Sequence, residues 1–241
     1  MSKKFWIVIV VIIVAMVGIF ALTGGKNNST SSTTSKPTDH VIGLGKTGVT
    51  LVEFGDYQCP YCGQYYSTIK QVQQAYNNQI TFQFVNFPLT SIHPNAFAGA
   101  RAAEAAGLMG QFWQMHDLLY TQNQEYYNSN GAYPGWIGAS DPLTVFDQDA
   151  KSLGLNVSKF NTYYQSDQVN NLIMADENKG NALNVNATPT FYIDGKQVQL
   201  ADSVSAFDTA INSAIAAKTS HSNKPVITSS GTTVQSKGTT K

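Results

Sequence analysis

The stretch that decides the fold is Glu53-Phe-Gly-Asp-Tyr-Gln-Cys59-Pro60-Tyr61-Cys62. It closes an apolar run, Val49–Gly55, that predicts a strand, and apolar residues recur at helical spacing from Tyr61 to Tyr76. Two residues between cysteines on a first helical turn bring the sulfurs within disulfide distance. The leading thiol then lies at the helix N-terminus, where the helix dipole favours thiolate. Such a pair at a strand-to-helix junction indicates redox chemistry.

These are the only two cysteines in the 241-residue chain, so no disulfide framework holds the fold together. The pair is therefore free for chemistry in a compartment where disulfides persist. Charged residues make up 12% of the chain, and the formal net charge is zero. The sequence has no basic patch interleaved with aromatic residues, so we expect no nucleic-acid partner.

The N-terminal segment has the pattern of a membrane anchor. It is uncharged over residues 5–22 and follows two lysines, which predicts a transmembrane helix with residues 1–4 in the cytoplasm. The alternative is a cleaved signal peptide, whose apolar region usually spans about 7–15 residues. Either way we expect the remainder to be exported, with the redox domain on the extracytoplasmic side of the cell membrane. Polar composition predicts a flexible linker over 23–38 and a disordered tail over 219–241.

A strand–helix–strand unit comes first in the folded part of the chain. After the strand Val49–Gly55 and its helix, Ile80–Phe87 alternates as a second strand and is ended by Pro88. A connection of this kind predicts two parallel strands with a right-handed crossover.

A helical region over about 89–186 separates this unit from a second pair of strands. The pair is Thr190–Asp194 and Lys196–Leu200, with a hairpin turn at Asp194-Gly195, and Ser203 caps a last helix. Neither half alone can bury both faces of its strands. We therefore expect one α/β domain in which a helical region interrupts a single sheet.

A second motif lies far downstream, at Ala187-Thr188-Pro189-Thr190-Phe191-Tyr192-Ile193-Asp194-Gly195. Together with the Cys59–Cys62 stretch it resembles the thioredoxin fold and, more narrowly, the DsbA-like thiol–disulfide oxidoreductases. The resemblance covers roughly residues 39–218 and is specific at the two motifs. It implies a thioredoxin-like fold with an inserted helical domain, here between about 89 and 186.

The resemblance also implies roles for individual residues. Cys59 matches the exposed nucleophile of the family, Cys62 its buried resolving cysteine, and Pro189 its cis-proline, beside which Thr188 presents an extended edge to a substrate peptide. Glu53 matches a buried acid that passes a proton to or from Cys62 if burial raises its pKa. The alternative for Glu53 is an acidic side chain that faces water.

The dipeptide between the cysteines departs from the strongest oxidants of the family. Those members place a histidine there, whose positive charge favours thiolate, whereas Pro60-Tyr61 supplies no charge. We therefore expect a less acidic Cys59 and a milder oxidant. We assign Pro60 and Tyr61, together with Thr188, to the substrate-binding surface.

Other readings of the cysteine pair are weaker. A zinc site needs about four ligands, and the nearest candidates, Asp56 and His93, form no second half of one. His93 precedes Pro94 and is typical of a helix cap or a surface residue. A purely structural disulfide across so short a loop would constrain little. We expect no metal and no cofactor, because the redox equivalents reside on the sulfurs.

The sequence therefore predicts a membrane-tethered oxidoreductase that introduces disulfides into exported proteins. By resemblance, a membrane quinone-linked partner re-oxidises it. One alternative is a reductase or isomerase kept reduced by a membrane donor, because the potential of the partner decides the direction. A second alternative is a non-catalytic peptide-binding or chaperone module.

Overall fold

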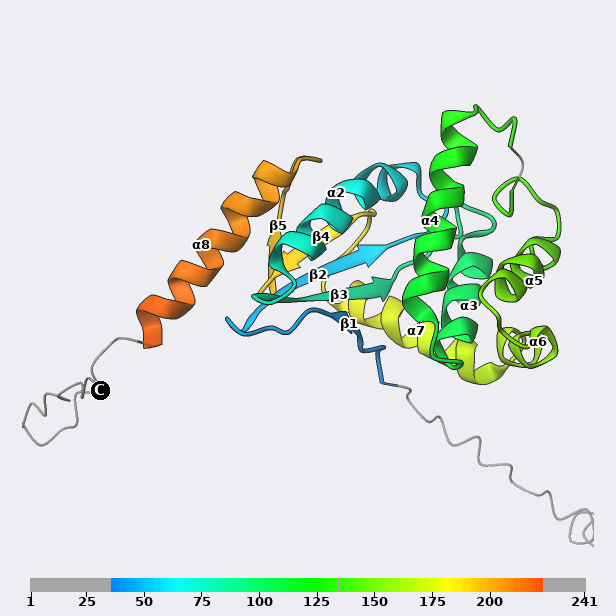
Figure 1. Ribbon diagram of the computed structural model, residues 1–241, viewed down its shortest axis with the longest axis horizontal. Coiled ribbons are helices and arrows are strands. Elements are labelled where there is room, and N and C mark those ends of the chain that lie inside the picture. Colours follow the sequence, from blue (N-terminus) through cyan, green and yellow to red (C-terminus); the bar gives the residue numbers. More distant parts are fainter. Residues whose placement is uncertain (1–35, 134, 223–241) are drawn as a thin grey trace, which may run out of the picture. The chain divides into compact units, whose positions relative to one another are not determined.

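The computed structural model describes residues 36–133 and 135–222 (Figure 1). The predicted cytoplasmic end and transmembrane anchor, and the linker up to residue 35, lie outside the described residues. Residues 223–241 of the predicted tail do so as well. Within the described ranges, no helix is both long and apolar enough to cross a membrane.

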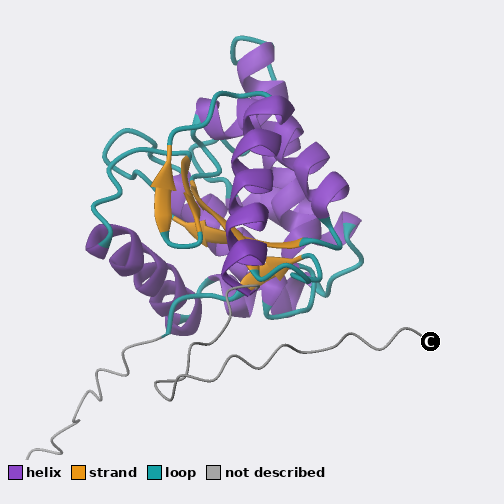
Figure 2. Cartoon of the chain, turned by 90° about the vertical axis from the view of Figure 1, so that its left-hand side faces the viewer, coloured by secondary structure: helices purple, strands orange, loops and turns teal. Residues whose placement is uncertain are grey.

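A five-stranded sheet lies at the centre of the domain (Figure 2). Its strands are β1 (His40–Ile42), β2 (Val49–Gly55), β3 (Ile80–Asn86), β4 (Thr190–Ile193) and β5 (Lys196–Val198), in the order β1-β3-β2-β4-β5. β2 and β3 are parallel, as predicted, and the other neighbours are antiparallel. β1 was not predicted, because three partly exposed residues carry no readable periodicity.

The hairpin between β4 and β5 turns at Asp194-Gly195, as predicted. Both residues have positive φ, 48° and 77°, which a type I′ turn requires. The Asp194 carboxylate also accepts a hydrogen bond from the backbone N–H of Thr50 at 3.0 Å. The turn is thereby joined to the start of β2.

Seven described helices surround the sheet. They are α2 (Pro60–Tyr76), α3 (Ala96–Gly107), α4 (Phe112–Asn128), α5 (Leu143–Ser152), α6 (Val157–Tyr164), α7 (Asp167–Ala182) and α8 (Val204–Ser222). Helices α3 to α7 all lie between β3 and β4 in the chain, which confirms the inserted helical region (Figure 1). Helix α8 continues through residues 219–222, which the sequence assigned to the tail. No glycine or proline interrupts it before Pro225.

The two faces of the sheet carry different clusters. Phe54 and Phe87 lie on the face covered by α7, where a side chain at Gly180 would collide with the Phe87 ring, so the helix approaches closely. Val49 and Leu51 point to the opposite face and share a core with residues of α2 and α8. Because successive side chains of a strand alternate, Glu53 lies on the same face as Leu51, toward the helix that carries Cys62.

Candidate active site

Cys59 and Cys62 lie at the junction of β2 and α2. Cys59 is the N-cap residue of α2, and Pro60 occupies its first turn. Both cysteines are free thiols. Cys62 is fully buried, and Cys59 is only 3% exposed, so the prediction of an exposed nucleophile is wrong for this conformation. The reason is that Cys59 Sγ points to the Thr188 carbonyl oxygen, 3.2 Å away, and not to solvent.

The pKa values of the two thiols are shifted in opposite directions. A hydrogen bond from Cys62 to the thiolate is the main cause that lowers the pKa of Cys59 to about 6; the Thr188 side chain and the Cys62 backbone add to it, while burial and the Asp56 charge oppose it. Burial, followed by the hydrogen bond and the charge of Cys59, raises the pKa of Cys62 well above its usual value. At neutral pH, Cys59 is thus a thiolate and Cys62 a thiol.

Thr188 contacts Cys59 in two ways that favour different protonation states. Its carbonyl oxygen accepts a hydrogen bond from the thiol, which favours the thiol. Its buried hydroxyl has no partner among the described residues and is available to donate to the thiolate. The second contact is the stronger, because hydrogen bonds to charged acceptors are roughly twice as strong as neutral ones.

The Thr188–Pro189 peptide bond is cis, which confirms the cis-proline prediction. Pro189 lines a hollow of about 100 Å³, together with Tyr65 of α2 and residues of the β4–β5 hairpin and the segment after it. The Tyr61 side chain, 64% exposed, is the most solvent-accessible part of the Cys-Pro-Tyr-Cys segment, and Pro60 is half-buried. The three residues assigned to the substrate surface, and the cis-proline, thus lie at or next to the thiols.

Glu53 is buried, with 3% of its surface exposed, so the alternative of a water-facing side chain is wrong. Loss of solvation, followed by the charge of the Cys59 thiolate, raises its pKa to about 8. The carboxyl group is therefore mostly protonated at neutral pH in the reduced protein. A pKa near the working pH is what proton transfer to or from Cys62 requires.

Side chains of α4 hold the active-site loop, and the sequence did not reveal them. The Asn123 amide donates to the carbonyl oxygens of Tyr57 and Cys59, at 2.8 and 3.1 Å. Tyr127 donates to the carbonyl of Gln58 at 2.9 Å, and Gln124 donates to that of Gly63 at 2.8 Å. These are polar residues of an ordinary helix, and only the tertiary fold brings them to the loop.

Gly63 offers the one local signal of this contact. A side chain there would collide with the Asn123 amide. A glycine directly after the second cysteine therefore reports the close approach of another element, although it does not say which one.

Asp56 and His93 form a second link between the loop and the insertion. Asp56 is 1% exposed and accepts hydrogen bonds from the Gln58 N–H at 2.8 Å, the Leu89 N–H at 2.9 Å and His93 Nδ1 at 2.6 Å. The sequence suggested that His93 is a helix cap or a surface residue. The structure shows instead that its side chain is half-buried against Asp56. The hydrogen bond with Asp56 is the main cause that raises the pKa of His93.

Comparison with known proteins agrees with this geometry. The protein-family model described as Thioredoxin matches residues 35–213. This chain belongs to the thioredoxin family. Among solved structures, α-DsbA1 of Wolbachia pipientis (TM-score 0.63, 17% identity, 78% of this chain and 96% of that one) and oxidised BdbD of Bacillus subtilis (0.60, 20%, 76% and 97%) have the same fold. The recognition of a DsbA-like thioredoxin fold is confirmed.

The curated relatives of this thioredoxin-family chain are longer proteins. It is 33% identical over 159 residues to Na(+)/H(+) antiporter NhaA 1 of Mycolicibacterium gilvum, covering 66% of this chain and 24% of that protein. For the protein of the same name from Salinispora arenicola the values are 34% over 178 residues, 74% and 25%. The chain thus spans about a quarter of the length of these relatives.

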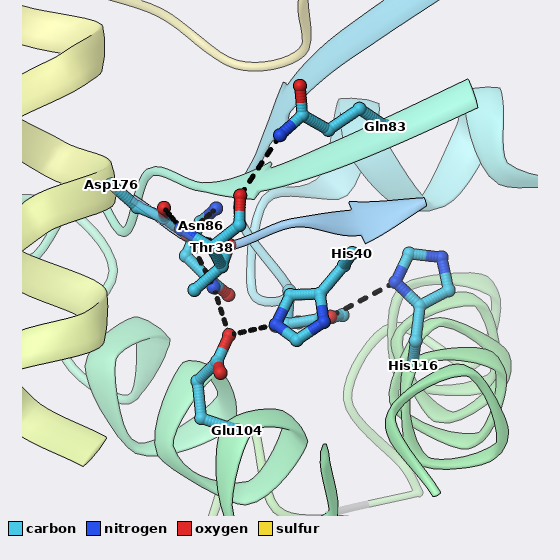
Figure 3. Close-up of polar contacts among 8 residues, drawn as sticks. Thr38, His40, Gln83, Asn86, Glu104, His116 and Asp176 are labelled. Atoms are coloured by element: carbon cyan, nitrogen blue, oxygen red, sulfur yellow. Dashed lines mark hydrogen bonds and ion pairs between the residues drawn. The ribbon is translucent and has the colours of Figure 1, made fainter. Parts of the chain in front are cut away.

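A buried polar network joins β3 to α3, to α7 and to the start of the described chain (Figure 3). Asn86 donates through its side chain to Glu104 at 2.7 Å and to Asp176 at 3.0 Å. Asp176 also accepts two hydrogen bonds from Thr38, each 2.7 Å long, and Glu104 pairs with His40 Nε2 at 2.8 Å. In the thioredoxin-family domain this network holds the segment that leads into β1.

Among the residues that the structure describes, no group of three or more His, Cys, Asp or Glu side chains is arranged to hold a metal ion. Glu104 is instead paired with His40, as Figure 3 shows, and Asp56 is paired with His93.

Proposed function

We propose that the chain catalyses thiol–disulfide exchange through Cys59 and Cys62 and introduces disulfides into exported proteins. The observation that carries this proposal is the asymmetry of the two thiols, one with a pKa of about 6 and the other raised well above the usual value. A low-pKa thiolate is a good leaving group, and a protonated, buried partner remains ready to resolve mixed disulfides.

In the oxidised protein, a substrate thiolate attacks Cys59 Sγ of the Cys59–Cys62 disulfide. The bond between the two cysteines breaks, a mixed disulfide forms at Cys59, and Cys62 leaves as a thiolate that takes a proton from Glu53. A second substrate thiolate then attacks the substrate sulfur of the mixed disulfide and expels the Cys59 thiolate. The substrate gains a disulfide, and its two electrons remain on the reduced pair.

The acidity of Cys59 supports the oxidative direction. Its pKa of about 6 lies between the values of about 7 for thioredoxin and about 3.5 for DsbA. Stabilising the thiolate stabilises the reduced protein and makes the disulfide a better oxidant. The moderate value agrees with the milder oxidant expected from the uncharged Pro60-Tyr61.

The reduction potential of the full-length chain in glutathione buffers tests the direction. A potential well above the thioredoxin value of about −270 mV supports disulfide donation. A potential at or below that value would reject it in favour of a reductase or isomerase kept reduced by a membrane donor.

A Cys62→Ser variant separates an enzyme from a peptide-binding or chaperone module. Without the resolving thiol, an exchanging protein accumulates mixed disulfides through Cys59, which non-reducing gels detect and which Cys59→Ser abolishes. A protein that only binds peptides forms no such adducts.

We further propose that residues 5–22 anchor the protein in the cell membrane, with the redox domain outside the cytoplasm, and that a quinone-linked membrane partner re-oxidises it. The uncharged segment after two lysines supports the anchor. Carbonate extraction of membranes, combined with intact mass measurement, tests it. A soluble product that lacks the segment would instead identify a cleaved signal peptide.

A further inference from the structure

The Asp56–His93 pair places two charges of opposite sign next to the nucleophile. Asp56 lies three positions before Cys59, and its carbonyl oxygen accepts a hydrogen bond from the Cys59 N–H at 3.1 Å. Its carboxyl group accepts three hydrogen bonds, two from backbone N–H groups and one from His93 Nδ1. Both carboxyl oxygens of Asp56 thus accept hydrogen bonds.

An uncompensated carboxylate at this position would oppose the chemistry of Cys59. The Asp56 charge raises the pKa of the Cys59 thiol, because two negative charges repel in a poorly solvated site. The dipeptide Pro60-Tyr61 supplies no cation to offset it. The group that pairs with Asp56 is the imidazole of His93, which lies in the segment between β3 and α3.

We propose that His93 is a positioning residue for thiol–disulfide exchange: its imidazolium neutralises Asp56 and thereby keeps Cys59 in the thiolate form. The inference rests on the exchange chemistry of Cys59 proposed above, and it does not depend on the direction of electron flow. It assigns to a side chain outside the Cys-x-x-Cys segment the positive charge that this segment lacks.

The electrostatics of the pair support this role. The Cys59 thiolate contributes to the raised pKa of His93. An interaction between two titrating groups is reciprocal, so the imidazolium favours the thiolate to the same extent. Other titratable groups that interact with Cys59 are Glu53 on β2, Cys62 on α2 and Tyr127 on α4. Their raised pKa values, about 8 for Glu53 and about 12 for Tyr127, keep all three largely neutral at pH 7.

Alkylation kinetics of the reduced, full-length chain test the proposal. Because the raised pKa of Cys62 keeps that thiol protonated, the rate of reaction with iodoacetamide against pH reports the thiolate of Cys59. In His93→Gln we expect the midpoint to rise by about half to one pH unit and the rate at pH 5.5 to fall about threefold to eightfold. Adding Asp56→Asn to this variant removes the uncompensated charge and should return the midpoint toward that of the wild type.

His40→Gln is a matched control. His40 also pairs with a buried carboxylate, at 2.8 Å from Glu104, and the side-chain exposures of the two pairs are similar: 18% and 2% against 13% and 0% for His93 and Asp56. We expect His40→Gln to lower the thermal stability without moving the alkylation midpoint. An unchanged midpoint in His93→Gln, or an equal shift in both variants, would overturn the proposal.

A measurement on the unaltered protein covers the case in which His93→Gln does not fold. The imidazole of His93 is titrated by NMR in the reduced and in the oxidised protein. The oxidised form has no thiolate, so we expect a pKa of His93 about 0.3 units or more lower than in the reduced form. Equal values in the two redox states would refute the coupling.

Discussion

Replacing Glu53 by glutamine is expected to stabilise the protein and to slow its chemistry. The folded structure raises the pKa of this carboxyl group from 4.5 to about 8, mainly because burial removes its solvation. Between these two pH values the folded chain retains a proton that the unfolded chain releases. Ionisation therefore favours unfolding, and the stability of the wild type falls as the pH rises through this window.

The size of the effect follows from the pKa difference. Each unit between the ordinary pKa and the working pH is worth about 1.4 kcal/mol, so Glu53 costs about 3 kcal/mol at pH 7 and almost nothing at pH 4. Glutamine has nearly the same shape and never ionises. We therefore expect Glu53→Gln to raise the free energy of unfolding by about 3 kcal/mol at pH 7 and to leave it unchanged at pH 4.

Urea denaturation of the reduced wild type and of Glu53→Gln, at pH 4, 5.5 and 7, measures this difference. Stopped-flow measurement of mixed-disulfide resolution should show a rate about 100-fold lower in the variant, because the proton relay to Cys62 is lost. Glu104→Gln is the control: Glu104 is equally buried but hydrogen-bonded to Asn86 and His40, so its loss should destabilise the fold. The reasoning is refuted if Glu53→Gln is no more stable at pH 7 than at pH 4, relative to the wild type.

Two further predictions concern the contacts of the active-site loop. Thr188→Val removes the hydroxyl that donates to the Cys59 thiolate, and we expect the thiolate absorbance at 240 nm to titrate about one pH unit higher and the disulfide to be less oxidising. Asn123→Ala removes the side-chain donor to the carbonyl of Tyr57 and one of the two donors to that of Cys59, and we expect about 2 kcal/mol lower stability in urea and faster hydrogen exchange at the start of α2. Unchanged values in these measurements would contradict the two assignments.

Much of the fold follows from local patterns. The strand Val49–Gly55 has the predicted bounds, and α2 begins at Pro60, one residue before the prediction. The Asp194-Gly195 hairpin is also as predicted, whereas the cis bond at Pro189 was implied by the resemblance to DsbA-like proteins and not by the local pattern. Strand alternation, helical periodicity and turn residues are properties of neighbouring positions, so these elements are readable without tertiary contacts.

The supporting half of the site was not predictable in this way. Asn123 and Tyr127 reach the active-site loop from α4, and His93 reaches Asp56 across 37 positions of the chain. Nothing in the local pattern of these polar residues distinguishes them from solvated side chains. The strand β1 was missed for a related reason, since its three residues become a strand only by pairing with β3.

The amino-acid sequence by itself determined the chemistry of this protein: two thiols at the start of a helix, a proline turn to meet them and an acid on the preceding strand. Only the tertiary structure decided how reactive each group is. Burial keeps Glu53 a neutral acid. The fold also directs the Cys59 thiol toward Thr188 instead of solvent and brings His93 to Asp56. Acidity depends on solvation and on neighbouring charges, and both are set by elements that meet only in the folded chain.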